Sequence, residues 1–373
     1  MKKVLIISRQ FLGGGIGLYT YECFTKLKKW HDTKIITTYY RNKIEDTNNV
    51  IRVKETGSFL PDAIRFFLHS LFNTLRLDYD TIFGTTYFHG FLGIFAKILR
   101  RKKLVVTIHD LGLAEKFIRS NSIINIGRYF LHKLVTKYAD SIIVTNKKMI
   151  KDLNTHFGVK ESKIVYSPLG IDTGIFNPEV EAGTVKRKFG INGNTPILFS
   201  AGIRPKKGLE YLVEACKILK GNGRDFKVII AGSATSIFKP YLDKLNTMID
   251  EFQLRENFIF PGIVELEDMP YYYKDCDIYV APSYYGEGWG MPCTEAAAVG
   301  VPIVATTLFE DTGVVVNNET GLVVNPKDSK QLAIAIEKLL TDKELANKFK
   351  ENGIMYVKQF TWEWHVEKIA GVI

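Results

Sequence analysis

Two glutamates, Glu287 and Glu295, stand at the ends of a nine-residue stretch that reads EGWGMPCTE. The apolar run at 277–282 before them predicts a buried strand. Three alanines, a valine and a glycine at 296–300 predict a helix that the glycine ends. Pro292 suits the first helical position, where its missing N–H costs nothing. We therefore expect a strand, a glycine-bearing loop and a helix start, with a carboxylate on either side of the turn.

The start of this helix predicts an anion site. The backbone amides of residues 291–294 are expected to point out of the helix, where a phosphate can accept from them. Carboxylates repel phosphates but accept hydrogen bonds from hydroxyl groups. A nucleotide sugar carries both a phosphate and sugar hydroxyls, so it is the predicted ligand. The alternative is that Glu287 is a solvated loop residue and Glu295 a residue that caps the helix.

The two glutamates and their surroundings resemble the signature of retaining GT-B glycosyltransferases of family four. The E-x7-E spacing lies within 282–306, PSYYGEGWGMPCTEAAAVGVPIVAT. The resemblance implies that Glu287 lies at the donor sugar and that Glu295 holds the ribose diol of the nucleotide. The residues between them are assigned to the donor site as well: Gly288, Trp289, Gly290, Met291 and Pro292.

Length and composition indicate a globular protein with two domains. The chain has 373 residues, 46% of them hydrophobic and 24% charged, which is long enough for two domains of ordinary size. It contains no apolar stretch of 18 residues, so no transmembrane helix is expected. The start, MKKVLIISRQ, predicts a first strand rather than a signal peptide. The four cysteines show no metal-ligand spacing, and we expect reduced thiols in a cytoplasmic protein.

The net charge of +10 is unevenly placed. Residues 1–170 carry 28 Lys and Arg against 13 Asp and Glu, a balance of +15, whereas residues 171–373 carry 22 against 27, a balance of −5. This asymmetry predicts that the N-terminal half faces an anionic partner. An anionic membrane surface is the predicted partner, with the protein peripheral on the inner face of the cell membrane, and nucleic acid is not expected. A soluble sugar acceptor with incidental basic charge remains the alternative.

Strands alternate with helices in both halves, which predicts two doubly wound, Rossmann-like α/β domains with a cleft between them. Together with the resemblance, this pattern predicts the GT-B fold. We expect an N-terminal, acceptor-binding domain at 1–168 that also includes a C-terminal helix at about 358–373. The donor-binding domain is expected at 169–357. The segment 164–172 is predicted to be the linker, because it contains a proline and a glycine.

Two features of the N-terminal half are assigned to the site. A glycine cluster at 13–17 follows the first predicted strand; the resemblance places Gly14 and Gly15 near the donor phosphates, and a tight turn with close helix packing is the alternative. His109 follows the strand 103–108, at the edge of an open α/β sheet where ligands bind. The run VVTIHD resembles the family segment whose histidine contacts the donor sugar, and a purely structural histidine is the alternative.

The helix predicted at 62–77 carries apolar residues at 64, 67, 68, 71, 72 and 75. Packing on the core is the expected role of this apolar side, and a membrane-surface helix is the alternative. The basic run 100–103 is expected to mark a helix end, where cations suit the dipole. Arg65, Arg76 and the run 100–103 are the residues expected to meet lipid phosphates.

The loop 201–208, AGIRPKKG, resembles the phosphate-clamp loop of the family. Lys207 matches the clamp lysine, while Gly202 stands where an arginine is usual, and Arg204 is expected to supply that cation from a shifted position. Gly232, after the predicted strand 227–231, is also assigned to the donor site. The loop 306–313 departs from the family pattern, so the donor sugar is not carried over. Asp275 and Asp277 precede a strand, away from its functional end, and no metal is expected.

These observations predict a retaining, metal-independent glycosyltransferase. Its donor is a nucleoside-diphosphate sugar, UDP- or GDP-linked, and no cofactor is expected. The acceptor is a hydroxyl of a glycan or a lipid-linked molecule, in cell-surface polysaccharide or glycoconjugate synthesis. His109, Glu287, Lys207 and Arg204 are the expected catalytic residues. The alternative is a GT-B protein of another activity, either a sugar-nucleotide epimerase or a binder without turnover.

Overall fold

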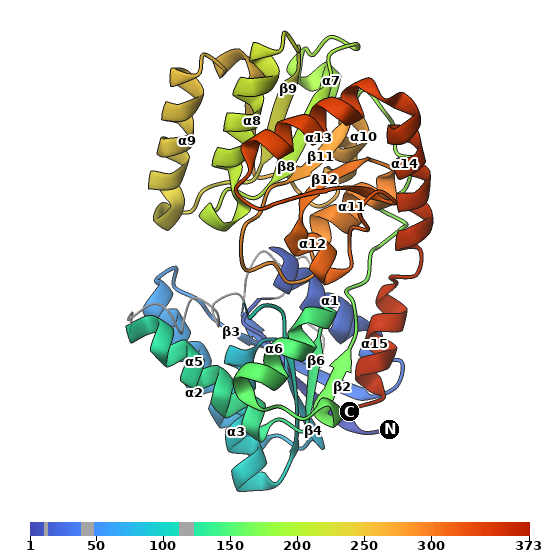
Figure 1. Ribbon diagram of the computed structural model, residues 1–373. Helices are drawn as coiled ribbons and strands as arrows, with labels where there is room; N and C mark the ends of the chain where they lie inside the picture. The colour runs from blue at the N-terminus through green and yellow to red at the C-terminus, as the bar shows by residue number, and fades with distance from the viewer. Residues whose placement is uncertain (11–13, 39–47, 112–122) are drawn as a thin grey trace. The chain divides into compact units, whose positions relative to one another are not determined.

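The computed structural model describes residues 1–10, 14–38, 48–111 and 123–373 (Figure 1). The contacts within the chain divide it into two compact units. Unit 1 comprises Met1–Gly170 and Thr361–Ile373, and unit 2 comprises Ile171–Phe360. The acceptor-binding and donor-binding roles assigned to these parts of the chain remain predictions.

Unit 1 is built on seven parallel strands in the order β3-β2-β1-β4-β5-β6-β7. The strands are β1 (Lys3–Ile7), β2 (Asp32–Thr38), β3 (Val50–Val53), β4 (Thr81–Gly84), β5 (Lys103–Ile108), β6 (Ser141–Val144) and β7 (Ile164–Tyr166). The central strands are continuous runs of apolar residues because both faces of a parallel sheet are covered by helices. The strand order reverses between β1 and β4, which makes this edge a ligand-binding position of the fold.

The helices of unit 1 form two layers. They are α1 (Gly14–Leu27), α2 (Phe59–Arg76), α3 (Tyr87–Arg100), α5 (Ile123–Tyr138), α6 (Lys147–Phe157) and α15 (Trp362–Ala370). Right-handed crossovers place α1 on one face of the sheet and α2, α3 and α5 side by side on the other. The C-terminal helix α15 packs against α1. His365 of α15 forms a hydrogen bond to the hydroxyl of Ser167, with 2.8 Å between Nδ1 and Oγ.

Helix α2 buries a different side from the one expected. Phe66 is 1% exposed, and Ser70 and Thr74 are also buried on this side, whereas Phe67 and Leu71 pack at its margin. The core interpretation is therefore wrong for the others: Ile64, Leu68, Phe72 and Leu75 are 53%, 58%, 58% and 41% exposed. The sequence misled because α2 has apolar residues on two sides, and small hydroxyl residues occupy part of the side that packs.

Unit 2 repeats this architecture with six parallel strands in the order β10-β9-β8-β11-β12-β13. The strands are β8 (Ile197–Ala201), β9 (Lys227–Ala231), β10 (Phe258–Gly262), β11 (Ile278–Ala281), β12 (Ile303–Thr306) and β13 (Gly321–Val324). This is the doubly wound order in which the chain leaves β8 toward one edge and later returns to place β11 on its other side. Two such sheets confirm the predicted fold class.

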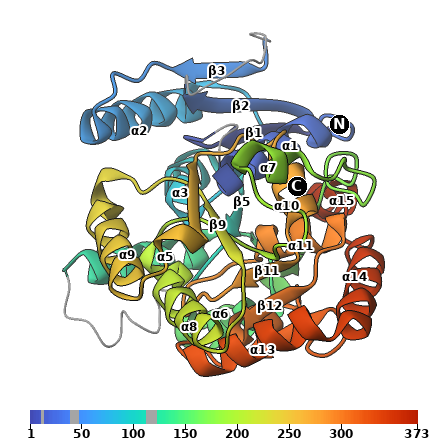
Figure 2. The same ribbon diagram turned by 90° about the horizontal axis from the view of Figure 1, so that it is seen from above.

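The helices of unit 2 cover both faces of its sheet. They are α7 (Thr184–Phe189), α8 (Leu209–Gly221), α9 (Lys239–Glu251), α10 (Met269–Asp275), α11 (Met291–Val299), α12 (Thr307–Thr312), α13 (Ser329–Thr341) and α14 (Lys343–Val357). Helices α8 and α13 lie side by side (Figure 2). They close a core over β8 and β9 that includes Leu198, Leu212, Val228 and Ile336, each at most 1% exposed.

Two sequence-based assignments are corrected by these elements. Residues 164–166 belong not to a linker but to β7, which pairs with β6 at the edge of the sheet of unit 1. The stretch expected to be a loop after β12 contains α12, which begins directly at the end of that strand. Within the described ranges, no helix is both long and apolar enough to cross a membrane.

Candidate active site

The expected donor residues of the clamp loop and of the nine-residue stretch lie beyond the carboxyl ends of β8 and β11, two neighbouring parallel strands. The loop after β8 carries Arg204 and Lys207 before α8, and the loop after β11 carries Glu287 before α11. The strand order of unit 2 reverses between β8 and β11, and α/β folds bind ligands in the crevice at such a position. The topology therefore brings together residues that are 80 positions apart in the sequence.

Lys207 and Glu287 form a buried ion pair. Lys207 Nζ lies 3.1 Å from Glu287 Oε1, and the two side chains are 17% and 7% exposed. The Ser283 hydroxyl donates to the same carboxylate oxygen at 2.8 Å. Burial alone would raise the pKa of Glu287, but Lys207 and Lys206 outweigh burial and hold that pKa below its ordinary value. Glu287 is therefore a carboxylate at neutral pH.

Lys206 has a different role from its neighbour. Its Nζ donates to the Gly286 carbonyl oxygen at 2.7 Å, and the Tyr284 amide donates to the Lys206 carbonyl oxygen at 3.1 Å. These two hydrogen bonds join the loop after β8 to the loop after β11. Gly208 allows the close approach of the two loops, since a Cβ atom there would lie 2.3 Å from the Pro282 carbonyl oxygen.

Glu295 lies in α11 and is 7% exposed. Tyr273 of α10 donates its hydroxyl hydrogen to Glu295 Oε2 at 2.7 Å. Burial raises the pKa of Glu295 to about 7, although the Tyr273 hydroxyl and Lys207 both act to lower it. The two glutamates of the nine-residue stretch therefore differ in protonation, since one is ionised and the other titrates near neutral pH.

The anion site expected from four free amides at the start of α11 is smaller than predicted. Pro292 has no N–H, and the amides of Cys293 and Thr294 donate to the Gly290 carbonyl oxygen at 2.9 and 3.3 Å. Gly290 caps the helix with φ +95°, and a Cβ atom there would lie 2.8 Å from Phe309. Of the four expected amides, only that of Met291 is left to donate to an anion. The helix start would therefore attract an anion mainly through the helix dipole.

The backbone of the clamp loop accounts for the missing arginine. Gly202, which stands at the usual arginine position, has φ +89°, a conformation that residues with a side chain rarely adopt. Gly232, at the end of β9, has φ +119°, and a Cβ atom there would lie 3.4 Å from Gly202. Arg204 is exposed, and it has no ion pair with another described residue.

Trp289 is buried rather than open to the site. It is 3% exposed and its ring packs edge-on against Phe360, with 4.9 Å between the ring centroids. Its Nε1 lacks a hydrogen-bond partner among the described residues. A role of Trp289 or Gly288 in donor binding remains a prediction, and for Trp289 the side chain serves the packing of unit 2.

The acidic pair at 275 and 277 serves the fold. Asp275 accepts from the amides of Val185 and Lys186 at 2.6 and 3.0 Å, so it caps α7. Asp277 accepts from the Ile197 amide at 2.9 Å, at the start of β8. Both carboxylates lie at the amino end of β11, opposite to the end that carries Glu287. Among the described residues, no three His, Cys, Asp or Glu side chains gather in a group that could hold a metal ion.

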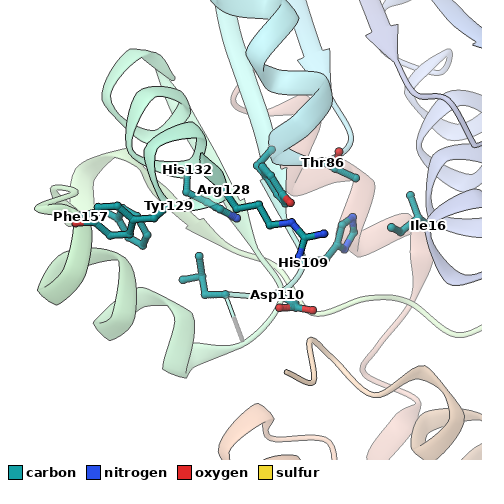
Figure 3. Close-up of a pocket in the computed structure, with 10 residues that line it drawn as sticks. Ile16, Thr86, His109, Asp110, Arg128, Tyr129, His132 and Phe157 are labelled. Carbon is teal, nitrogen blue, oxygen red and sulfur yellow. The ribbon is translucent and has the colours of Figure 1, made fainter. Parts of the chain in front are cut away.

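His109 lies in unit 1, directly after β5, and lines a pocket of about 270 Å³ (Figure 3). Its Nε2 lies 3.0 Å from the Thr85 carbonyl oxygen, so this nitrogen carries the proton. Burial lowers the pKa of His109 to about 4, and the ring is therefore neutral near pH 7. Nδ1 is left as a hydrogen-bond acceptor.

The rest of the pocket was not predicted. In Figure 3 the Arg128 guanidinium points toward the His109 ring, and Asp110 lies below both of them. Tyr129 and Phe157 form an aromatic wall farther along the pocket, where their rings stack with centroids 5.3 Å apart. Arg128 comes from α5 and gave no signal in the sequence, because no motif surrounds it. Gly14 and Gly15 begin α1, and the preceding Gly13 lies outside the described residues.

Two doubly wound units with a candidate site at a switch point define a GT-B protein. The solved structures with this fold include sucrose-phosphate synthase from Thermosynechococcus elongatus, with a TM-score of 0.83, 20% identity and coverage of 100% of this chain and 98% of that one. HepE from Anabaena, in complex with UDP and glucose, is similar with a TM-score of 0.80 at 18% identity and coverage of 100% and 99%.

Residues 183–355 match the family described as glycosyl transferases group 1, and residues 13–174 match Glycosyltransferase Family 4. Together these two matches span most of the chain and indicate a GT-B glycosyltransferase. A D-inositol 3-phosphate glycosyltransferase from Corynebacterium aurimucosum is 26% identical over 81% of this chain and 74% of its own length. The capsular polysaccharide biosynthesis glycosyltransferase CapM from Staphylococcus aureus is 29% identical over 63% of this chain and 62% of its own length.

Proposed function

We propose that this protein transfers a sugar from a nucleoside-diphosphate sugar to a hydroxyl of a glycan or a lipid-linked acceptor. The transfer retains the configuration at the anomeric carbon and needs no metal ion. The observation that carries this proposal is the buried Lys207–Glu287 pair at the switch point of unit 2. It places one fixed cation and one fixed anion where a ligand of this fold binds.

Lys207 is suited to the leaving group. As the bond between the anomeric carbon and the diphosphate breaks, negative charge grows on the phosphate oxygens and positive charge on the sugar. A cation that is already in place stabilises the first charge without reorganisation. Glu287 remains ionised beside it and is suited to orient the sugar and to stabilise the second charge.

The resemblance implies attack on the face that the diphosphate leaves. The acceptor oxygen forms its bond to the anomeric carbon as the bond to the diphosphate oxygen breaks. The proton of the acceptor hydroxyl passes to the leaving phosphate oxygen, so no covalent sugar–protein bond is needed. His109, neutral and with Nδ1 free to accept, is suited to hold a hydroxyl of the donor sugar.

Glu295 is suited to the ribose diol, because a carboxylate accepts from two neighbouring hydroxyls. Tyr273 occupies only one of its oxygens. The base is proposed to be uracil or guanine. HepE was solved with UDP-glucose, and a relative from Mycobacterium tuberculosis is described as GDP-mannose-dependent. The acceptor is proposed to belong to polysaccharide or glycoconjugate synthesis, since CapM is described as a capsular polysaccharide biosynthesis enzyme and LpsB as a mannosyltransferase of lipopolysaccharide core biosynthesis.

A thermal-shift panel of UDP-, GDP- and ADP-sugars tests donor binding. We expect one nucleotide to raise the melting temperature of the wild-type protein and of Lys220→Ala, which removes an exposed lysine of α8. The same nucleotide should raise the melting temperature of Lys207→Ala by less than it raises that of the wild type. Release of free sugar from the bound donor without acceptor then distinguishes an enzyme from a binder. Equal shifts for both variants would overturn the assignment of Lys207.

A further inference from the structure

Unit 1 presents large apolar side chains to solvent along three neighbouring helices. Of the 17 such side chains that are exposed among the described residues, eleven lie on α2, α3 and α5. We call their shared outer surface the α2–α3–α5 face. Its apolar members are Leu60, Ile64, Leu68, Phe72 and Leu75 of α2, Phe88, Ile98 and Leu99 of α3, and Ile126, Phe130 and Leu134 of α5.

These side chains are surplus to the core. Each helix already buries other apolar residues toward the sheet, for example Phe66 of α2, Leu92 of α3 and Val135 of α5, at no more than 1% exposure. Scattered exposed hydrophobic residues are normal in proteins, but a continuous exposed apolar surface indicates a binding surface. The concentration on three adjacent helices therefore points to a partner for this face.

The charge on the same helices identifies the chemistry of the partner. Together α2, α3 and α5 carry seven Lys and Arg, namely Arg65, Arg76, Lys97, Arg100, Arg128, Lys133 and Lys137. Their one acidic residue is Asp62, which is 3% exposed and accepts from the amides of Thr56 and Gly57 at 2.8 and 2.9 Å. Arg100 and Lys97 are half-buried, Lys97 forms an ion pair with Asp140, and Arg128 points into the pocket beside His109. The exposed cations left to the face are Arg65, Arg76, Lys133 and Lys137, and these helices add no exposed carboxylate.

We propose that the α2–α3–α5 face docks on an anionic lipid surface. Leu68, Phe72 and their neighbours enter the boundary between headgroups and acyl chains, while Arg76, Lys133 and Lys137 meet lipid phosphates. Membranes combine these two demands, since they offer negative charge at the surface and an apolar layer beneath it. The docking is independent of donor binding, which is assigned to unit 2 and is measurable in solution without lipid.

The basic run 100–103 contributes less than the sequence suggested. Arg100 donates to the carbonyl oxygens of Thr74 and Leu77 at 2.9 and 2.6 Å, so it joins α3 to α2. Lys102 lies over the ring of Tyr79. These two side chains stabilise the arrangement of the helices. The charges proposed to meet lipid phosphates are instead Arg76 of α2 and Lys133 and Lys137 of α5.

Co-sedimentation of the full chain with vesicles tests the apolar part of this proposal. The vesicles contain phosphatidylcholine alone or equal parts of phosphatidylcholine and phosphatidylglycerol. We expect binding to the mixed vesicles at low salt, and a loss of at least about tenfold for the double variant Leu68→Ser, Phe72→Ser. The matched control is Ile237→Ser, Ile334→Ser, which removes two exposed apolar side chains from unit 2 and should bind as wild type does. Because all four side chains are exposed, both variants should keep the melting temperature of the wild type.

A second pair of variants tests the contribution of the basic side chains to vesicle binding. We expect Lys133→Gln, Lys137→Gln to weaken binding to the mixed vesicles by about fivefold for each charge removed. Lys220→Gln, Lys348→Gln removes two exposed lysines of unit 2 and should leave binding unchanged. High salt should weaken the binding of the wild-type protein, since exposed charges are screened.

Three results would overturn the proposal. One is equal binding of the wild type to neutral and anionic vesicles, and another is unchanged binding of both variants of the face. The third is self-association: if sedimentation velocity without lipid gives a dimer that Leu68→Ser, Phe72→Ser dissociates, and the wild type does not bind vesicles, then the face binds a second copy of the chain.

Discussion

The proposed chemistry of unit 2 depends on two side chains, Lys207 and Glu287, which form a buried ion pair. Lys207 is the one cation close to both glutamates of the nine-residue stretch, as far as the described residues show, since it lowers the pKa of each. In the proposed reaction, removal of this lysine leaves a buried carboxylate without its ion-pair partner and a leaving diphosphate without its cation. We therefore expect that the effects of replacing the lysine and the glutamate on turnover are not additive.

Replacing Lys207 and replacing Arg204 of the clamp loop are expected to lower kcat by different factors. Lys207→Ala should lower kcat by about 10²–10³-fold, the usual loss when one group that stabilises transition-state charge is removed. Arg204→Ala should lower kcat by a smaller factor, because the Arg204 side chain is exposed. Release of nucleoside diphosphate measures both. Full turnover of Arg204→Ala would remove the idea that this arginine replaces the one missing at Gly202.

Glu295 predicts a pH dependence of donor binding. Its pKa is about 7, and only the ionised form accepts from both ribose hydroxyls. The affinity for a nucleotide sugar should therefore rise by about tenfold from pH 6 to pH 8, as the carboxyl loses its proton. Calorimetry with a nucleotide sugar measures this, since its diphosphate does not titrate in the range. Glu295→Gln should bind more weakly and show no such rise, and a rise equal to that of the wild type would exclude Glu295 as its origin.

The same group predicts a pH dependence of stability. The pKa of Glu295 is raised from 4.5 to about 7 on folding, so between these pH values the folded protein binds more protons than the unfolded chain. The stability that Glu295 contributes through this proton is fully present below pH 4.5 and is lost as the pH rises through 7. Relative to Glu295→Gln, the free energy of unfolding should fall by up to about 3 kcal/mol over this range. Urea denaturation of both proteins at several pH values measures it, and parallel profiles would contradict the raised pKa.

At the scale of elements, the turn between β11 and α11 fixes the position of Glu287. Gly290→Ala should destabilise unit 2 by about 1–3 kcal/mol, because φ there is +95° and the added methyl group meets Phe309 at 2.8 Å. Gly193→Ala is the control, since Gly193 is exposed, has an ordinary φ and has open space around it. Urea denaturation compares the two variants. Equal stability of the two variants would show that this turn tolerates a side chain.

The elements were predictable where one physical rule dominates. Apolar runs of four to six residues between glycines and helical patterns gave β8, β9, β11 and β13, because strands in a covered parallel sheet have no polar face. The start of α11 was predicted, but the use of its amides was not, since Gly290 folds back its carbonyl oxygen on Cys293 and Thr294. That detail depends on local backbone geometry, which residue types do not determine.

Tertiary packing decided what the sequence left open. The apolar side of α2 could be assigned to the core or to a surface, and only the packing of Phe66 on the sheet shows that Leu68 and Phe72 face solvent. Lys207 and Glu287 were assigned to one site from motifs, but their contact requires β8 and β11 to be neighbours. Arg128 was missed because its pocket is assembled from distant segments.

At the scale of the whole molecule, each unit has a distinct set of features. Unit 2 holds the clamp loop, both glutamates and the switch point of a doubly wound sheet. Unit 1 holds His109, the pocket around it and the α2–α3–α5 face. The proposed division of labour follows, with the nucleotide held by unit 2 and the acceptor and the lipid surface met by unit 1.

The most direct test of the proposed reaction is time-resolved proton NMR of the preferred nucleotide sugar with the protein, in the presence of EDTA. The anomeric proton reports the configuration of the sugar that is first released, before it equilibrates in water. We predict release of the nucleoside diphosphate together with a sugar of the same anomeric configuration as the donor, and an unchanged rate when EDTA is omitted. A first product of inverted configuration, or no release of sugar until a divalent metal is added, would contradict retaining, metal-independent transfer.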